Sequence, residues 1–169
     1  ERAARYGDRV FIRFGDEKVS YREANETANR FAAVLADKGV GRGDVVGIML
    51  RNSPNAVLMM LAAVKCGAVA GMLNYHQRSD VLSHSIGLLK ATVVVAESDL
   101  IDPIKESGAE TNQLTTIEDL VEQAKPYRRY TPAAPHFRLV HQGEQAWSVE
   151  SWPRHHERRL SAFGRSLLG

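Results

Sequence analysis

Apolar residues recur at two different spacings along the first 125 residues of the chain, one typical of a β-strand and the other of an α-helix. The segment RVFIRF, residues 9–14, alternates apolar with polar side chains, and the turn letters GDEK and the pair VS follow it, which predicts a β-hairpin. Residues 21–38 carry apolar side chains at helical spacing instead, on a stripe made of Ala24, Ala28, Phe31, Ala32 and Leu35. Ser20 and Glu23 are spaced as a capping box, in which each side chain accepts from the other residue's backbone amide, and this predicts where the helix begins.

Three glycines, Gly39, Gly41 and Gly43, follow this helix and precede the apolar run 45–50. A phosphate-binding loop needs the order strand, glycines, helix, because the amino terminus of the helix supplies the amides and the positive dipole. The order here is helix, glycines, strand. We therefore predict that Gly39 closes the helix in the left-handed conformation and that the other two glycines form the turn into a strand.

Three nearly continuous apolar runs, at residues 45–50, 68–74 and 92–96, are typical of strands that are covered on both faces. Helical segments separate them, and strands joined in this way form right-handed crossovers within a parallel sheet. We expect an α/β fold, namely a partial, mainly parallel sheet with flanking helices.

The helical segments have recognisable ends. An apolar helix over Pro54–Cys66 is predicted to be capped by Ser53 and ended by Gly67, with Pro54 at the first helical position. Ser79 is expected to cap a short helix that runs to about Leu89. Thr116 is expected to cap another within residues 114–124, and the segment from Glu97 to Gln113 is expected to be a loop with at most one helical turn.

Charge and composition change near Pro126. Residues 1–125 hold 15 Lys and Arg against 17 Asp and Glu, whereas residues 126–169 hold seven Arg, no Lys and three Glu. The second part also has both tryptophans and four of the six histidines, and it lacks periodicity over most of its length. We expect a partial domain over 1–125 and an atypical Arg-rich tail over 126–169 that is disordered or translated out of frame.

A rival interpretation makes this tail a basic arm that contacts nucleic acid through its arginines and aromatic side chains. Glu144, Glu150 and Glu157 dilute its charge, so specific nucleic-acid binding is not expected.

Composition otherwise fits a globular protein, with 44% apolar and 25% charged residues. The longest apolar stretch, Ala56–Val64, is far too short to span a bilayer. A single cysteine, Cys66, cannot form an internal disulfide, which favours a reducing compartment and a cytoplasmic location.

Few residues suggest chemistry. His76 and His84 lack a third ligand at metal spacing, and His155 and His156 lack cysteine or carboxylate partners. His84 lies between two serines, but neighbours in a helix point apart, so a nucleophile pair is not expected. Cys66 is predicted to fill space in the core. His76 follows a strand end, where α/β proteins place ligands, but a polar turn residue is the favoured interpretation.

Residues 1 to about 97 resemble the amino-terminal segment of the AMP-forming acyl-CoA synthetases, especially the fatty-acid and very-long-chain branch that includes the fatty acid transport proteins. The resemblance is carried, in one order and at the right spacing, by SYREANETANRFA, GVGRGDVV and NSPNAVLMMLAAVKCGAVAGMLN. It implies a fragment of a fatty-acid–CoA ligase that uses ATP, Mg²⁺ and CoA and acts by way of an acyl-adenylate.

The family's Thr/Ser/Gly-rich phosphate loop and its later motifs are not found in residues 98–169. No catalytic, cofactor-binding or metal residue is therefore assigned to any position, and the fragment is expected to be inactive and to bind none of the three cofactors. The resemblance leaves membrane association of the intact family open.

In the intact family this segment would pack on the rest of a larger amino-terminal domain. We therefore expect the fragment to leave apolar surface bare around Pro54–Cys66 and Thr92–Ala96, which would allow self-association. The alternative function is a non-catalytic α/β module that binds a partner.

Overall fold

A mainly parallel sheet is the centre of the computed structural model, which describes residues 2–127, 138–140 and 147–148. Within these residues the strand order is β6-β5-β3-β4-β7-β8. The strands are β3 (Val45–Met49), β4 (Val69–Met72), β5 (Val93–Ala96), β6 (Leu114–Thr116), β7 (Arg138–Val140) and β8 (Trp147–Ser148). Neighbours pair in parallel except β7 and β8, which are antiparallel. The expected α/β fold is confirmed.

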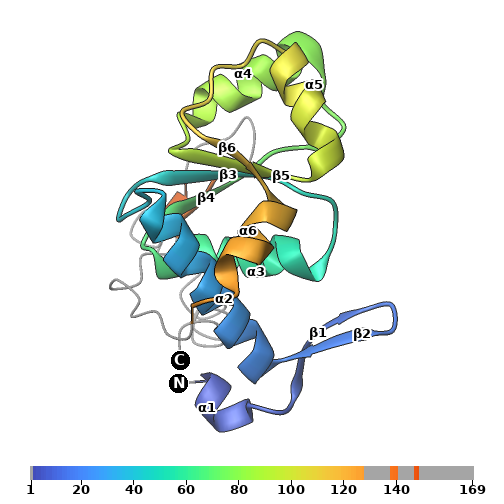
Figure 1. Cartoon of the computed structure of the whole chain (residues 1–169), viewed down its shortest axis with the longest axis vertical. Helices are drawn as coiled ribbons and strands as arrows, with labels where there is room; N and C mark the ends of the chain where they lie inside the picture. The colour runs from blue at the N-terminus through green and yellow to red at the C-terminus, as the bar shows by residue number, and fades with distance from the viewer. Residues whose placement is uncertain (1, 128–137, 141–146, 149–169) are drawn as a thin grey trace, which may run out of the picture.

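Helices cover both faces of the sheet (Figure 1). One face packs against α2 (Tyr21–Asp37), α3 (Pro54–Lys65) and α6 (Ile117–Ala124), and the other against α4 (Ser79–Leu89) and α5 (Ile101–Glu106), which follows the short 3-10 helix η1 (Ser98–Leu100). Each face has its own core, with Phe31 and Met59 fully enclosed on the first and Leu82 and Ile104 on the second. The strands are apolar on both faces because each face is buried.

The predicted hairpin is formed by β1 (Val10–Phe14) and β2 (Glu17–Ser20), which pair antiparallel. It projects from the body of the molecule beside α1 (Arg2–Tyr6) at the lower end of Figure 1. Aromatic packing attaches it there, since the rings of Phe11 and Tyr21 lie 4.8 Å apart.

Most predicted helix ends are confirmed. The Ser20 hydroxyl accepts from the Glu23 amide (3.2 Å), and Glu23 Oε2 accepts from the Ser20 amide (2.8 Å). Gly39 has a φ of 85° directly after α2, as a left-handed helix stop requires. Ser53 and Thr116 also accept from amides of the first turns of α3 and α6.

Ser79 is not the cap of α4. The N-cap is Arg78, which makes no side-chain capping bond, and Ser79 is the first helical residue with a φ of 49°. The preceding turn sets where the chain enters α4, and this tertiary constraint overrides the local capping preference of serine.

Three strands were missed by sequence reasoning. β6 forms the start of the run 114–124, from which only a helix capped by Thr116 was expected, and β7 and β8 lie in the tail. These strands have two or three residues each, too few for an alternation to be recognised. The expected disorder or frame change falls largely on residues 128–137, 141–146 and 149–169, which lie outside the described part.

Apolar surface is exposed at places other than those expected. Val93, Val94, Val95 and Ala96 of β5 are at most 1% exposed, and the apolar side chains of α3 are buried or half-buried. For β5 the expectation of bare surface is wrong, because helices cover the strand on both faces, whereas Val57, Met60 and Leu61 of α3 are half-buried. Within the described part of the chain, the exposed large apolar side chains are Val10, Phe14, Val81, Leu88 and Val121.

Candidate functional site

The carboxyl ends of β3, β4 and β5 lie side by side, because the three strands are parallel neighbours. Open α/β sheets bind their ligands beyond this edge. Three short segments leave the sheet here. They begin at Arg51 after β3, at Asn74 after β4 and at Glu97 after β5. We call them together the carboxyl edge, and they form the candidate site.

One guanidinium joins two of these segments. Arg51 Nη1 and Nη2 donate to the two carboxylate oxygens of Asp99 at 3.0 and 2.7 Å, and Nη1 also pairs with Glu97. The backbone amide of Arg51 donates to the other Glu97 oxygen, Oε1, at 2.7 Å. These bonds lower the pKa of Asp99 and raise that of Arg51, since each stabilises the charged form of its partner.

The third segment meets the same guanidinium through an aromatic ring. The Arg51 guanidinium carbon lies 5.7 Å from the centre of the Tyr75 ring, within cation–π range. The His76 ring stacks at a tilt on Tyr75, with ring centres 4.1 Å apart. Arg51, which follows β3, therefore contacts groups that follow both β4 and β5.

The turn after β4 is held by its own side chains. Asn74 Oδ1 accepts from the His76 amide at 2.9 Å, and Arg78 Nη1 donates to the carbonyl oxygens of Tyr75 (2.7 Å) and Gln77 (2.6 Å). His76 thus lies in a polar turn at a strand end, as the favoured interpretation had it, and the structure adds its stacking on Tyr75.

The other candidates take no part in this edge. Ser85 Oγ donates to the carbonyl oxygen of Val81 (2.9 Å), as helical serines commonly do. The Cys66 thiol is 1% exposed and lies 3.4 Å from the carbonyl oxygen of Ala32, as a core residue would. Among the described residues, His, Cys, Asp and Glu nowhere gather in a group of three that could hold a metal ion.

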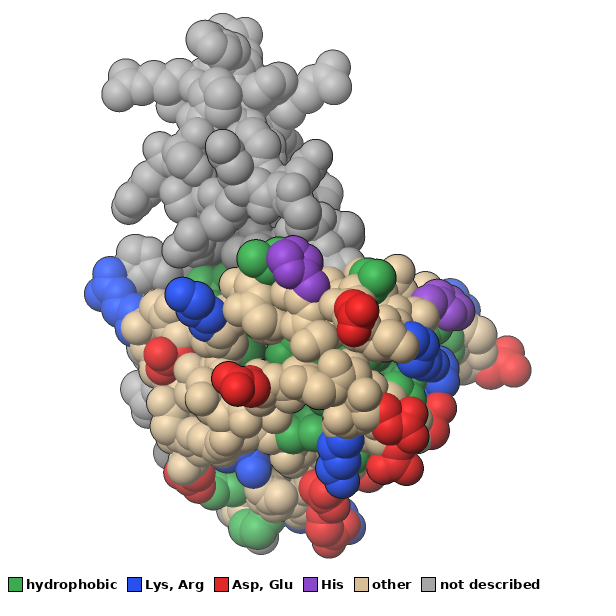
Figure 2. Space-filling view, turned by 90° about the horizontal axis from the view of Figure 1, so that it is seen from above, with side chains coloured by type: hydrophobic (Ala, Val, Ile, Leu, Met, Phe, Trp, Pro, Cys, Tyr) green, Lys and Arg blue, Asp and Glu red, His purple; other side chains and the backbone are tan. Residues whose placement is uncertain are grey.

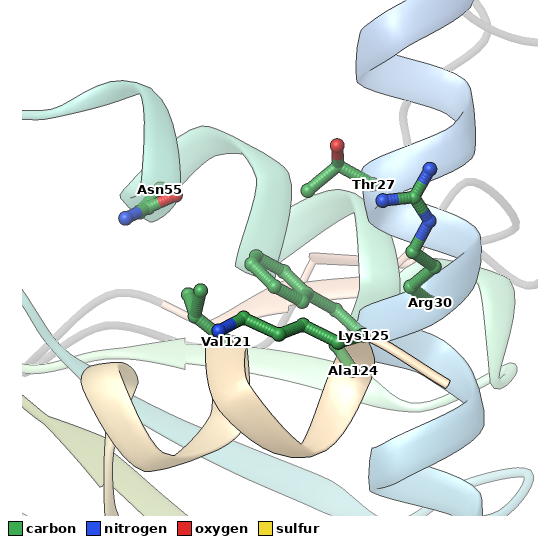
Figure 3. A pocket seen from close by; sticks show the side chains of 7 residues that line it. Thr27, Arg30, Asn55, Val121, Ala124 and Lys125 are labelled. Atoms are coloured by element: carbon green, nitrogen blue, oxygen red, sulfur yellow. The ribbon is translucent and has the colours of Figure 1, made fainter. Parts of the chain in front are cut away.

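A groove of about 260 Å³ lies on the opposite side of the sheet from α4 (Figure 3). It runs between α2, α3 and α6 and is lined by Thr27, Arg30, Phe31, Asn55, Val121, Ala124 and Lys125. Its cations are already paired, Arg30 with Glu26 and Lys125 with Glu122. Phe31 is 2% exposed at the floor of this groove, and Val121 and Ala124 of α6 add apolar lining.

Sequence reasoning singled out His76 but missed Arg51, Glu97 and Asp99. A signal was present, because charged residues directly follow the buried runs that became β3 and β5. Glu97 and Asp99 lie 46 and 48 residues after Arg51 in the sequence, so their pairing with it depends on β3 and β5 being neighbours.

The helix end at Gly39 lies at the amino end of β3, away from the carboxyl edge. The amide of Gly41 donates to Asp44 Oδ2 (2.7 Å) within the turn. These glycines form a helix-to-strand connection, as predicted.

No described helix is long and apolar enough to cross a bilayer. The face of the molecule formed by α4 and α5 carries exposed apolar and histidine side chains among charged ones (Figure 2). Val81 and Leu88, both on α4, are 61% and 63% exposed, and the exposure of this pair was not predicted from the sequence.

Comparison with known proteins places the chain in a family. A family model described as AMP-binding enzyme matches residues 1–154. The chain is 52% identical over 178 aligned residues to the medium/long-chain-fatty-acid–CoA ligase FadD6 of Mycobacterium tuberculosis, covering 97% of this chain and 30% of that protein. It is 34% identical to a Mycobacterium marinum medium/long-chain-fatty-acid–CoA/3-oxocholest-4-en-26-oate–CoA ligase, covering 73% of this chain and 22% of that one.

Solved structures share the fold. The NpsA–ThdA adenylation–PCP di-domain of Klebsiella oxytoca superposes with a TM-score of 0.70 at 23% identity, covering 85% of this chain and 27% of that one. The chain therefore spans about a third or less of the length of these relatives. Its resemblance to fatty-acid–CoA ligases is confirmed, and the chain belongs to the AMP-binding enzyme family.

Proposed function

We propose that this chain is the amino-terminal part of a medium- or long-chain fatty-acid–CoA ligase and supplies the carboxyl edge to a site that the remainder of the enzyme completes. The single observation that carries the proposal is the 52% identity to a ligase of that class across 97% of the chain. In the whole enzyme the fatty-acid carboxylate would attack the α-phosphate of ATP, so that pyrophosphate leaves and an acyl-adenylate forms. The CoA thiol would then attack the acyl carbon and displace AMP.

The described residues by themselves do not fit ATP and Mg²⁺. The Arg51 guanidinium at the carboxyl edge is already engaged by Asp99 and Glu97, and the described residues offer no cluster of three metal ligands. Triphosphate binding needs unengaged donors around several oxygens. We propose that ATP, Mg²⁺ and CoA bind only where the remainder of the enzyme is present.

The division at Pro126 is also a proposal. A change in composition supports it, while the family match continues to residue 154 and β7 pairs with β4 inside the sheet. A cytoplasmic location rests on the single, buried cysteine. We keep membrane association and self-association as proposals, the second supported by the exposed Val81 and Leu88 of α4.

Two grafts into the Mycobacterium tuberculosis relative test both proposals. In the first, residues 1–127 of this chain replace the matching segment of the relative, and the relative's own sequence continues from there. In the second, residues 1–169 replace the longer matching segment. We expect the first graft to form acyl-CoA from a long-chain fatty acid in the presence of ATP, Mg²⁺ and CoA. We expect the second to be inactive because the atypical tail over 126–169 would not fold as the relative's own segment does.

Three outcomes would contradict these proposals. A first graft that folds but makes no acyl-CoA would contradict the ligase assignment. An active second graft would contradict the proposed tail. The isolated chain should show no saturable ATP binding in equilibrium dialysis, and binding would contradict the proposal that the remainder is required.

A further inference from the structure

We propose that Arg51 is a positioning residue that fixes the Tyr75–His76 turn relative to the ends of β3 and β5. This inference rests on the proposed function for its relevance to catalysis, because the carboxyl edge would be one wall of the ligase site. The claim about the turn itself stands on the geometry of this chain alone.

The guanidinium of Arg51 contacts three partners at once through its two Nη donors and its flat face. Asp99 takes two donors of the fork, Glu97 shares one of them, and Tyr75 lies against the guanidinium at 5.7 Å. Lysine carries the same charge but has neither a planar fork nor a flat face, so it cannot hold all three in one arrangement.

In this arrangement the segment after β5 is fixed by contacts of its own, and the turn after β4 is held by Arg51. The segment after β5 is anchored independently, since Leu100 is 1% exposed in the core and Ser98 Oγ donates to Glu118 Oε2 on α6 at 2.8 Å. Tyr75 and Gln77, in contrast, are half-buried in a turn whose other residues, Asn74, His76 and Arg78, are exposed. Arg51 therefore transmits the position of the β5 segment to the Tyr75 ring and, through stacking, to His76.

Stability alone is a weak reason for this cluster. The side chains of Arg51 and Asp99 are 44% and 62% exposed, and ion pairs with that much exposure contribute little to folding. The Nη1 and Nη2 donors of Arg51 are also taken up by Asp99 and Glu97, which leaves the guanidinium poorly suited to bind a ligand anion. Positioning is the role that the observed contacts support.

The first test uses nuclear magnetic resonance on the full chain with Arg51→Lys and Arg51→Ala. The ring signals of Tyr75 and His76, assigned with Tyr75→Leu and His76→Gln, report the stacking. We expect both Arg51 variants to shift these signals and the amides of residues 74–79, while the amides of the β1–β2 hairpin stay as in the parent. Arg22→Lys, which changes an exposed pair with Asp8 (3.2 Å), is the matched control and should leave the turn unchanged.

Unchanged Tyr75 and His76 ring signals in Arg51→Lys would overturn the proposal. If Arg51→Ala fails to fold, the combination Glu97→Ala with Asp99→Ala removes both side-chain acceptors of Arg51 and leaves Arg51 in place. It should shift the same ring signals, and an absence of shift would likewise overturn the proposal.

The second test uses the active graft described above. We expect Arg51→Lys to lower kcat/KM about tenfold, because small displacements of a site wall are costly to catalysis. Adding Glu97→Gln and Asp99→Asn to Arg51→Ala should cause little further loss, since the three residues act as one unit. Fully additive losses would contradict positioning. An inactive parent graft would sink the ligase assignment and leave the magnetic-resonance test of the turn intact.

Discussion

The backbone amide of Val40 donates to the carbonyl oxygen of Leu35 at 3.0 Å, across the residue that ends α2. The amide of Gly39 donates to Ala36 at 2.9 Å in the same motif, and Val40 is 4% exposed beneath it. Together these two bonds form a Schellman motif, in which the residue after the C-cap is left-handed.

Replacement of Gly39 by alanine is predicted to destabilise the chain by about 1 kcal/mol, because a Cβ is unfavourable at a φ of 85°. Urea unfolding followed by circular dichroism measures the loss. Gly41→Ala is the matched control. A Cβ there would lie 3.7 Å from Asp44 Oδ2, an ordinary contact, and Gly41 has no positive φ. Equal losses in the two variants would contradict the helix-closing role of Gly39.

Ser20→Ala should cost about 1 kcal/mol of unfolding free energy, since the amide of Glu23 then loses its acceptor. Thr116→Ala removes the equivalent bond to Asp119 (2.9 Å) and should cost a similar amount at α6. Urea midpoints measure both. Ser83→Ala on α4, where Ser83 is not a cap, is the control, and a comparable loss in that variant would argue against capping as the cause.

Acid should weaken the fold through Asp99 and Glu23. The pKa of Asp99 is lowered mainly by the hydrogen bonds from Arg51, and that of Glu23 mainly by the backbone amide of Ser20. A lowered folded pKa gives stability that is fully present above the unfolded value, about 4 for these carboxyls, and is lost as pH falls through the folded value.

Urea midpoints recorded from about pH 6 down to about pH 3 should therefore decline more steeply for the parent than for Asp99→Asn or Glu23→Gln. Identical slopes for parent and Asp99→Asn would show that the carboxyl edge contributes no acid sensitivity.

Gly71 of β4 is closely packed against α4. A Cβ at this position would lie 2.9 Å from Leu89 Cδ2 and 3.3 Å from Val45 Cγ1. Gly71→Val is predicted to cost about 1–3 kcal/mol from overpacking. Gly71→Ala combined with Leu89→Ala should lose less than the sum of the two single changes, because the shorter side chain makes room. Additive losses in thermal unfolding would contradict this packing explanation.

Self-association is predicted to depend on α4. Val81 and Leu88 lie seven residues apart, on one face of the helix, and both are largely exposed. Val81→Ser with Leu88→Ser should lower the average mass in sedimentation at high concentration. Glu118→Gln with Glu122→Gln, on the exposed side of α6, is the control. A parent that stays monomeric at every concentration would reject this surface and favour a self-sufficient partner-binding module.

Local structure could be predicted from the sequence because its causes are local. The stripe on α2, the Ser20–Glu23 box and the stop at Gly39 depend on residues at most five positions apart, and all three are present. The buried runs that became β3, β4 and β5 also show their parallel character, since strands covered on both faces carry no polar alternation.

The sequence could not specify which strands are neighbours, because pairing depends on contacts between distant segments. β7 pairs with β4 although it lies in a tail of atypical composition, and Ser79 follows the turn rather than its capping preference. The candidate site depends on the same level of structure. Arg51 meets Glu97, Asp99 and Tyr75 only because parallel pairing aligns the ends of β3, β4 and β5, and no spacing along the chain encodes that meeting.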